Sequence, residues 1–280
     1  MEKAIKRYLP IFVLPTLAAF IIGFIAPFIM GVGLSFCEFT TVKDAKFVGI
    51  SNYVKAFQDT IFRHSFWYTA LFAIVSLIVI NVCAFALALA LTRKNERNKH
   101  LQDDFLYADL IGGIVLGYIW QLIFNGILAK YSTALALNQW LGFWGLIILV
   151  SWQQIGYMMI IYIAGLQSIP GEVMEAAQID GANSWQRLWK VTIPMMMPSI
   201  TICTFLSITN GFKLFDQNLS LTAGEPSKLS EMMALNIYNT FYGRSGWEGV
   251  GQAKAVIFFV IVVAIGLIQL RATRSKEVQQ

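Results

Sequence analysis

Six long apolar stretches constrain this 280-residue sequence more than any other feature. A helix of roughly 20 apolar residues crosses the hydrocarbon of a bilayer, and there its backbone polar groups must pair within the segment. Only 13% of the residues are charged, about half the share that is usual in soluble domains. The sequence therefore predicts an all-α integral membrane protein. Its six predicted transmembrane helices lie at about 9–36, 66–91, 105–128, 143–166, 198–215 and 251–270.

The distribution of basic residues indicates which side of the membrane each connection faces. Lys and Arg are denser in segments 1–8, 92–104, 167–197 and 271–280 than in the alternate segments. Because cytoplasmic connections are enriched in these residues, we expect both termini in the cytoplasm. The first stretch is too long for the apolar core of a signal peptide, and no small-residue cleavage pattern follows it. We interpret it as a membrane helix, with a bend expected at one of its prolines, at 15 or 27.

Cysteines and histidines do not form a recognisable site. Cys37, Cys83 and Cys203 are odd in number and scattered, which argues against a disulfide framework or a zinc site. His64 and His100 are far apart in the sequence. A phosphate-binding Gly-x-x-x-x-Gly-Lys-Ser/Thr loop is not found, nor is a nucleophile–base pair. We therefore expect a non-catalytic chain without a metal or cofactor of its own. Its net charge of +5 is concentrated beside apolar runs and does not indicate nucleic-acid binding.

The polar connection at about 167–197 has the pattern of a short helix, a turn and a second short helix. It begins with Pro-Gly, a typical helix start. Asp180-Gly181 is a turn signal, and Gly181 can adopt the left-handed conformation that ends a helix. Asn183 and Gln186 have the spacing of a capping box for the second helix, which we expect Pro194 to end.

The connection also contains Glu175-Ala176-Ala177, six residues before Gly181 as counted from Glu175, and it ends in Ile193-Pro194. With these residues it resembles the EAA loop of the membrane subunits of bacterial ABC importers. In that family the loop is a cytoplasmic coupling helix that sits in a cleft of the ATPase subunit, so the resemblance implies a role in ATPase coupling. From the residues alone, the alternative is an amphipathic interfacial helix that joins two spans. The residues implied in coupling are Glu175, Ala176, Ala177, Asp180, Gly181, Ile193 and Pro194.

A second resemblance concerns the substrate. Segment 215–226, with Phe-Asp, Leu-Thr and a Gly-rich turn before Pro226, is similar to the stretch after the fifth helix in carbohydrate importers of the maltose type. Segment 47–53 looks like the external segment after their first helix. Local chemistry alone supports a helix end with a Gly-Pro turn in the first case and an ordinary loop in the second. The acidic lead-in to the third helix, 102–109, departs from the family pattern.

The two resemblances imply a fold of the type I ABC importer kind and a permease subunit of an ATP-driven, binding-protein-dependent sugar or oligosaccharide importer. The implied partners are a second permease subunit, two ATPase subunits that carry ATP and Mg, an extracytoplasmic sugar-binding protein and membrane lipid. The implied location is the bacterial cytoplasmic membrane. We divide the chain into an N-terminal part with the first helix and an external loop, 1–64, a five-helix transmembrane domain, 65–272, and a tail, 273–280.

Polar and aromatic residues within or near the spans are candidates for the substrate path, because sugars bind by aromatic stacking and by hydrogen bonds. Polar groups inside a membrane usually face a cavity or a partner helix. The alternative is that most of these residues connect helices or lie at the membrane interface. The candidates are Tyr118, Trp120, Gln121, Asn125, Gln153, Asn210 and Lys213.

Other functions remain as alternatives. The same machinery could carry another solute, such as glycerol phosphate. An ion-coupled secondary carrier is a different class, in which inverted repeats or broken helices are common, and the sequence shows no clear repeat. A membrane enzyme is disfavoured because no catalytic constellation is visible.

Overall fold

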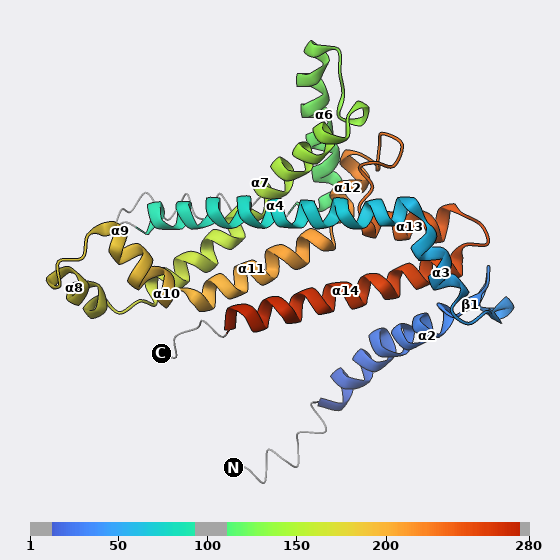
Figure 1. Ribbon diagram of the computed structural model, residues 1–280, viewed down its shortest axis with the longest axis horizontal. Helices are drawn as coiled ribbons and strands as arrows, with labels where there is room; N and C mark the ends of the chain where they lie inside the picture. The colour runs from blue at the N-terminus through green and yellow to red at the C-terminus, as the bar shows by residue number, and fades with distance from the viewer. Residues whose placement is uncertain (1–12, 93–110, 275–280) are drawn as a thin grey trace, which may run out of the picture. The chain divides into compact units, whose positions relative to one another are not determined.

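The computed structural model describes residues 13–92 and 111–274 (Figure 1). Within these residues, five helices are long and apolar enough to cross a membrane, and a bent helix pair raises the number to six. The prediction of a six-span, all-α membrane protein is confirmed. The pair is Ser184–Met195 with Met197–Phe212, bent by 71°. The single spans are Val13–Leu34, Thr60–Leu91, Gly113–Tyr131, Gln139–Gln167 and Glu248–Thr273.

Several expectations fall on residues outside the described part of the chain. These are the basic segment 1–8, the predicted start of the third span at 105, its acidic lead-in 102–109, and the tail beyond 274. The described residues form two compact units. The first comprises the chain through Thr60 together with Ile237–Phe259, and the second comprises Ile61–Asn236 together with the chain from Val260 onward.

In the first unit, the first span is followed by a small hairpin and a short helix. The span contains a π-helical turn, in which the Ala26 N–H bonds to the Ile21 carbonyl. Pro27 follows directly, and its missing N–H and bulky ring disturb the regular ladder, which the wider turn accommodates. The elements are η1 (Ile21–Ile25), α2 (Ala26–Leu34), β1 (Cys37–Glu38), η2 (Val42–Asp44), β2 (Lys46–Phe47) and α3 (Ser51–Gln58).

Helix α3 is attached to the end of the first span. Strands β1 and β2 pair antiparallel, with Cys37 opposite Phe47. The Nδ2 of buried Asn52 donates to the Ser35 carbonyl at 3.0 Å and to the Cys37 carbonyl at 2.8 Å. The Tyr53 hydroxyl lies 2.6 Å from the Ser35 hydroxyl. Segment 47–53, predicted to be external, thus forms the end of the hairpin and the start of α3.

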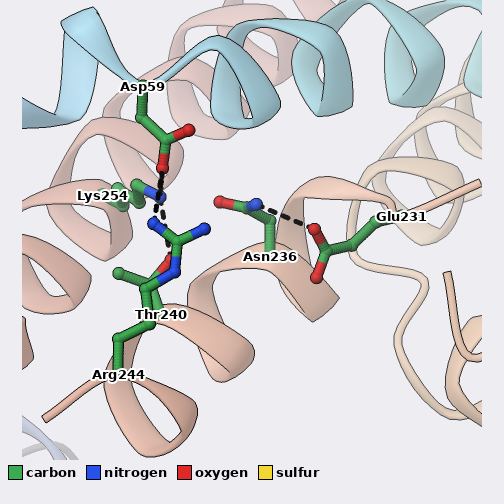
Figure 2. Close-up of polar contacts among 6 residues, drawn as sticks. All are labelled: Asp59, Glu231, Asn236, Thr240, Arg244 and Lys254. Carbon is green, nitrogen blue, oxygen red and sulfur yellow. Dashed lines mark hydrogen bonds and ion pairs between the residues drawn. The ribbon is translucent and has the colours of Figure 1, made fainter. Parts of the chain in front are cut away.

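A buried ion pair ties three parts of the first unit together (Figure 2). Helices α13 (Met233–Gly243) and α14 (Glu248–Arg274) both cross the boundary between the units. The fully buried Lys254 of α14 donates to Asp59 Oδ2 and to the Thr240 hydroxyl, each at 2.8 Å. Arg244 Nη1 lies 3.4 Å from the same Asp59 oxygen. This cluster was not predicted from the sequence, although a lysine inside an apolar span is a signal for it.

The second unit is a helical bundle with α7 at its centre. Phe72 and Phe143 pack edge to face there, and Met158 and Met159 are fully buried. Its elements are α4 (Thr60–Leu91), α6 (Gly113–Leu128), η4 (Ala129–Tyr131), η5 (Leu135–Leu137), α7 (Gln139–Gln167), α8 (Gly171–Ile179), α9 (Ser184–Arg187), η6 (Leu188–Thr192), α10 (Ile193–Met195), α11 (Met197–Phe212) and α12 (Asp216–Leu221).

Small residues bring two pairs of helices into close contact in the second unit. A Cβ on Gly117 of α6 would overlap the side chain of Ser220 of α12. A Cβ on Gly211 of α11 would lie 3.0 Å from the Cα of Ala73 of α4. In lipid, helix association depends on such close packing because apolar burial alone gives no driving force there.

Polar side chains also link α11 to its neighbours. The Tyr162 hydroxyl of α7 donates to Asn81 Oδ1 of α4 at 2.7 Å, and Asn81 Nδ2 donates to Ser207 Oγ of α11 at 2.9 Å. About one helical turn before Ser207, Thr204 Oγ1 of α11 accepts a hydrogen bond from Gln269 Nε2 of α14 at 2.7 Å. Helix α11 is therefore held by hydrogen bonds to two other helices, α4 and α14.

We predict that Lys254→Met destabilises the protein by roughly 3–5 kcal/mol, because it leaves the nearly buried carboxylate of Asp59 without its main partner. Arg244→Gln is the matched control and should cost less than about 1 kcal/mol, because Arg244 is partly exposed and its contact is longer. Denaturant unfolding of the purified protein measures both. Adding Asp59→Asn to Lys254→Met should restore part of the loss, and equal losses in the two single variants would contradict this assignment.

We predict that Gly117→Val disrupts the contact between α6 and α12 and destabilises the protein by about 1–3 kcal/mol, because the added methyl groups overlap Ser220. Gly126→Val on the same helix has open space around its Cβ and serves as the control. The shift in thermal unfolding midpoint of each variant is the measurement. The prediction is wrong if the two valines shift the midpoint equally.

Candidate functional site

The connection between α7 and α11 forms the two short helices predicted from sequence (Figure 1). Pro170 lies in an extended conformation at the N-cap of α8, and Glu172 lies in the first turn. That position suits a carboxylate because the helix N-terminus carries partial positive charge. Helix α9 follows after a four-residue turn, and the chain then continues through η6 and α10 to α11.

The turn between α8 and α9 is closed by two backbone hydrogen bonds. The Ala182 N–H bonds to the Ala177 carbonyl at 3.0 Å, and the Gly181 N–H bonds to the Gln178 carbonyl at 3.1 Å. This pattern is a Schellman motif, which needs a residue with positive φ after the C-cap. Gly181 has a φ of 78°. The predicted left-handed conformation of Gly181 is confirmed.

Helix α9 begins with a complete capping box, as the sequence predicts. The Gln186 N–H donates to Asn183 Oδ1 at 2.8 Å, and the Asn183 N–H donates to Gln186 Oε1 at 2.9 Å. Arg187 Nη2 also lies 3.3 Å from the Ser184 hydroxyl. These bonds satisfy backbone donors that a helix start otherwise leaves unpaired, so the geometry of the connection is set locally.

The prediction that Pro194 ends the second helix is wrong. The chain remains helical through the π turn η6, in which the Ile193 N–H bonds to the Leu188 carbonyl, and Pro194 lies inside α10. The wider turn accommodates the proline, which has no N–H and crowds the preceding turn. The break comes at buried Met196, where the 71° bend separates α10 from α11. The predicted pair Ile193 and Pro194 therefore lies just before this bend.

The connection exposes apolar and small side chains. Ile179 is 86% exposed and Trp185 is 67% exposed, and the Trp185 ring packs on that of Trp189, with centroids 5.6 Å apart. Glu175 and Ala176 are exposed as well. Small side chains allow another surface to approach the backbone, and an exposed apolar patch rimmed by polar groups is typical of an interaction site. The arrangement therefore fits a docking surface.

The side chains of three of the seven predicted path residues form hydrogen bonds within the second unit. Gln121 Nε2 donates to the Leu221 carbonyl at 3.0 Å, and the Leu135 N–H donates to Asn125 Oδ1 at 3.0 Å. Gln153 Oε1 accepts from Gln217 Nε2 at 2.8 Å. Gln121 and Gln153 thus contact α12, which lies in the segment singled out by the second resemblance.

The other four path candidates have different environments. Trp120 packs edge to face on Trp152, with ring centroids 5.7 Å apart. Tyr118 of α6 is exposed, Asn210 of α11 is half-buried, and Lys213 is exposed at the end of α11. The prediction that these residues line a path is not tested by this arrangement.

Asn218 of α12 organises the segment after this helix, a role that was not predicted from the sequence. Its Nδ2 donates to Thr222 Oγ1 at 3.0 Å and to the Ser230 carbonyl at 2.8 Å. Its Oδ1 accepts from the Met232 N–H at 3.0 Å. Asn218 is fully buried, yet in sequence it is one polar residue in a long polar segment, so no local signal distinguishes it.

Comparisons with known proteins agree with this architecture. Residues 110–275 match the family described as "Binding-protein-dependent transport system inner membrane component". The chain is 43% identical over 277 residues to a probable starch degradation products transport system permease protein of Thermoanaerobacterium thermosulfurigenes, with 96% of this chain and 94% of the relative covered. It is 28% identical to a multiple sugar-binding transport system permease protein of Streptococcus mutans, over 99% of both chains.

A solved structure shows the same fold. It is a bacterial ABC transporter involved in the import of the acidic polysaccharide alginate, and one of its chains aligns with a TM-score of 0.82 over 98% of both chains at 21% identity. The family match covers more than half of this sequence, and the similarity to the Thermoanaerobacterium protein covers nearly all of it. The chain therefore belongs to the family of binding-protein-dependent transport system inner membrane components, and it is a membrane-spanning permease subunit and not an enzyme.

Proposed function

We propose that this chain is the permease subunit of an ATP-driven importer for a sugar or oligosaccharide. The observation that carries the coupling part of this proposal is the exposed, locally ordered surface of α8 and α9, which is suited to docking in a partner. The names of the relatives, which refer to starch degradation products and multiple sugars, support a carbohydrate substrate.

The proposed assembly contains a second permease subunit, two ATPase subunits and an extracytoplasmic sugar-binding protein. ATP and Mg belong to the ATPase subunits, because this sequence has no phosphate-binding loop. In this assembly Glu175, Ala176 and Ala177 of α8 face the ATPase cleft, and Trp185 and Trp189 anchor the contact. Buried aromatic side chains are frequent anchors of protein interfaces.

In this assembly, a movement of the α8–α9 connection would displace the membrane spans that it joins. Its turn and both helix ends are held by local hydrogen bonds, so it moves as one body when the ATPase subunits close. Displacement passes through η6 and α10 to the bend at Met196 and then to α11. Because Asn81 and Gln269 bond to α11, the neighbouring helices follow it. Alternating access would arise from this movement against the second permease subunit.

Within the proposed path, the seven candidate residues separate into two groups. Gln121 and Gln153 hold α12, and Asn125 holds the turn after α6. We assign contact with the sugar to Tyr118, Asn210 and Lys213, whose side chains are exposed or half-buried in this chain. The edge-to-face contact of the Trp120 ring with the Trp152 ring favours a packing role for Trp120.

Glycerol phosphate or another solute is the main alternative to a sugar, since the same machinery would carry it. Competition of unlabelled solutes against labelled maltooligosaccharide uptake distinguishes these substrates. The family match is to a binding-protein-dependent system, which disfavours an ion-coupled secondary carrier.

We predict that both termini lie in the cytoplasm of a bacterial cell. A cysteine introduced at position 3 or 278 should react with a membrane-impermeant thiol reagent only after the cells are opened. Labelling of either cysteine in intact cells would reverse the proposed topology and would place the α8–α9 surface outside.

We predict that Gly181→Val yields a normally inserted protein that holds its ATPase partner poorly and does not import sugar. At a φ of 78°, a β-branched side chain costs of order 1–2 kcal/mol, so the turn between α8 and α9 should change while the spans remain intact. Co-purification of the ATPase subunit and uptake of labelled sugar are the two measurements.

Gly171→Val is the matched control, because it lies in the same connection, in helical conformation, with open space around its Cβ. It should retain most of both activities. If Gly181→Val also keeps ATPase binding and uptake near the wild-type values, the connection is a plain linker and the coupling proposal is wrong.

A further inference from the structure

Helix α3 presents three different faces around its axis. Asn52 and Ala56 are buried against the rest of the first unit. At 3.6 residues per turn, Ile50 at the N-cap, Val54 and Phe57 fall within about 60° of each other. All three are exposed, with Ile50 at 68% and Phe57 at 59%. This apolar face, defined by Ile50, Val54 and Phe57, is not covered by the described residues of the chain.

The third face of α3 is polar. Lys55 and Gln58 are exposed on it, and half-buried Ser51 begins it at the start of the helix. Lys55 is roughly 100° or more around the axis from each residue of the apolar face. A helix with one apolar face and one basic, polar face has the pattern of a helix that lies in the membrane interface.

The position of α3 along the membrane normal is set by its contacts with two spans. Asn52 bonds to the carbonyls of Ser35 and Cys37, one and three residues after the first span ends at Leu34. Asn52 also lies against Gly249 at the start of the last span, where an added Cβ would overlap its side chain. Helix α3 therefore lies where two spans leave the hydrocarbon.

We propose that α3 is an interfacial helix, with its apolar face inserted between the phospholipids at the non-cytoplasmic surface and Lys55 directed to their phosphates. Continuity with the spans supports lipid as the occupant, since the chain passes from α3 into α4 after Asp59 alone. The apolar face contains only aliphatic and aromatic residues, which suit acyl chains. Phe47 of β2, three residues before Ile50, is a further exposed apolar residue in this part of the chain.

Charge plays a smaller part in this proposal than apolar burial. Segment 37–58 carries Lys43, Lys46 and Lys55 against Glu38 and Asp44, so its net charge is +1. Asp44 accepts a hydrogen bond from the Thr41 hydroxyl at 2.6 Å. We therefore expect α3 to insert in neutral as well as anionic phospholipid.

Photo-crosslinking tests the occupant directly. The full-length chain, purified with the subunits that accompany it, is placed in nanodiscs of phosphatidylethanolamine and phosphatidylglycerol. A benzoylphenylalanine at position 57 should form a phospholipid adduct seen by mass spectrometry, and the same residue at position 55 on the polar face should form at least fivefold less. Equal adducts at 57 and 55, or a crosslink from 57 to an extracytoplasmic binding protein or another subunit in place of lipid, would overturn the proposal.

Spin labelling gives an independent measure of depth. Labels at positions 54 and 57, in a chain whose three cysteines are replaced, should collide with oxygen more than with a water-soluble nickel complex. Labels at positions 51 and 55 should show the reverse order. If all four positions are equally accessible to nickel, α3 lies in water and the interfacial assignment is wrong. This outcome bears on α3 alone, because the coupling proposal rests on α8 and α9.

Discussion

The absence of water inside a bilayer is the constraint on which this structure depends. Every backbone polar group within the spans must pair locally, which makes them helical, and every polar side chain there needs a partner. The Asn81 amide has such partners on two other helices, Tyr162 and Ser207. The Lys254 ammonium donates hydrogen bonds to the Asp59 carboxylate and the Thr240 hydroxyl. In a medium that gives little apolar driving force between helices, these bonds and the glycine contacts select how the helices pack.

The same physics explains why the connection between α7 and α11 differs from the spans. Outside the hydrocarbon, water competes for hydrogen bonds, so a short helix needs caps to persist. The Schellman turn at Gly181 and the capping box at Asn183 supply them. A connection ordered by its own bonds can expose Ile179 and Trp185 to a partner without losing its shape. This combination of local order and exposed apolar surface fits the docking role that we propose for it.

Much of the fold was predictable because the relevant signals are local. Span lengths follow from apolar runs, and Gly181 and the Asn183–Gln186 box follow from backbone geometry within a few residues. The effect of Pro194 was not predictable, because a π turn absorbs the proline and moves the break to Met196. The environments of Gln121 and Gln153 were also not predictable, since their partners on α12 are 64 or more residues away.

The sequence by itself determined that the chain spans a membrane six times, that it has no phosphate-binding loop, and that a capped polar connection follows the fourth span. These properties depend on composition and on contacts between near neighbours in the chain. Only the tertiary structure decided which polar residues are buried partners, such as Lys254 and Asn218, and which apolar residues remain uncovered, such as Phe57 and Trp185. Burial depends on which segments meet in space, and that is set by the packing of helices far apart in sequence.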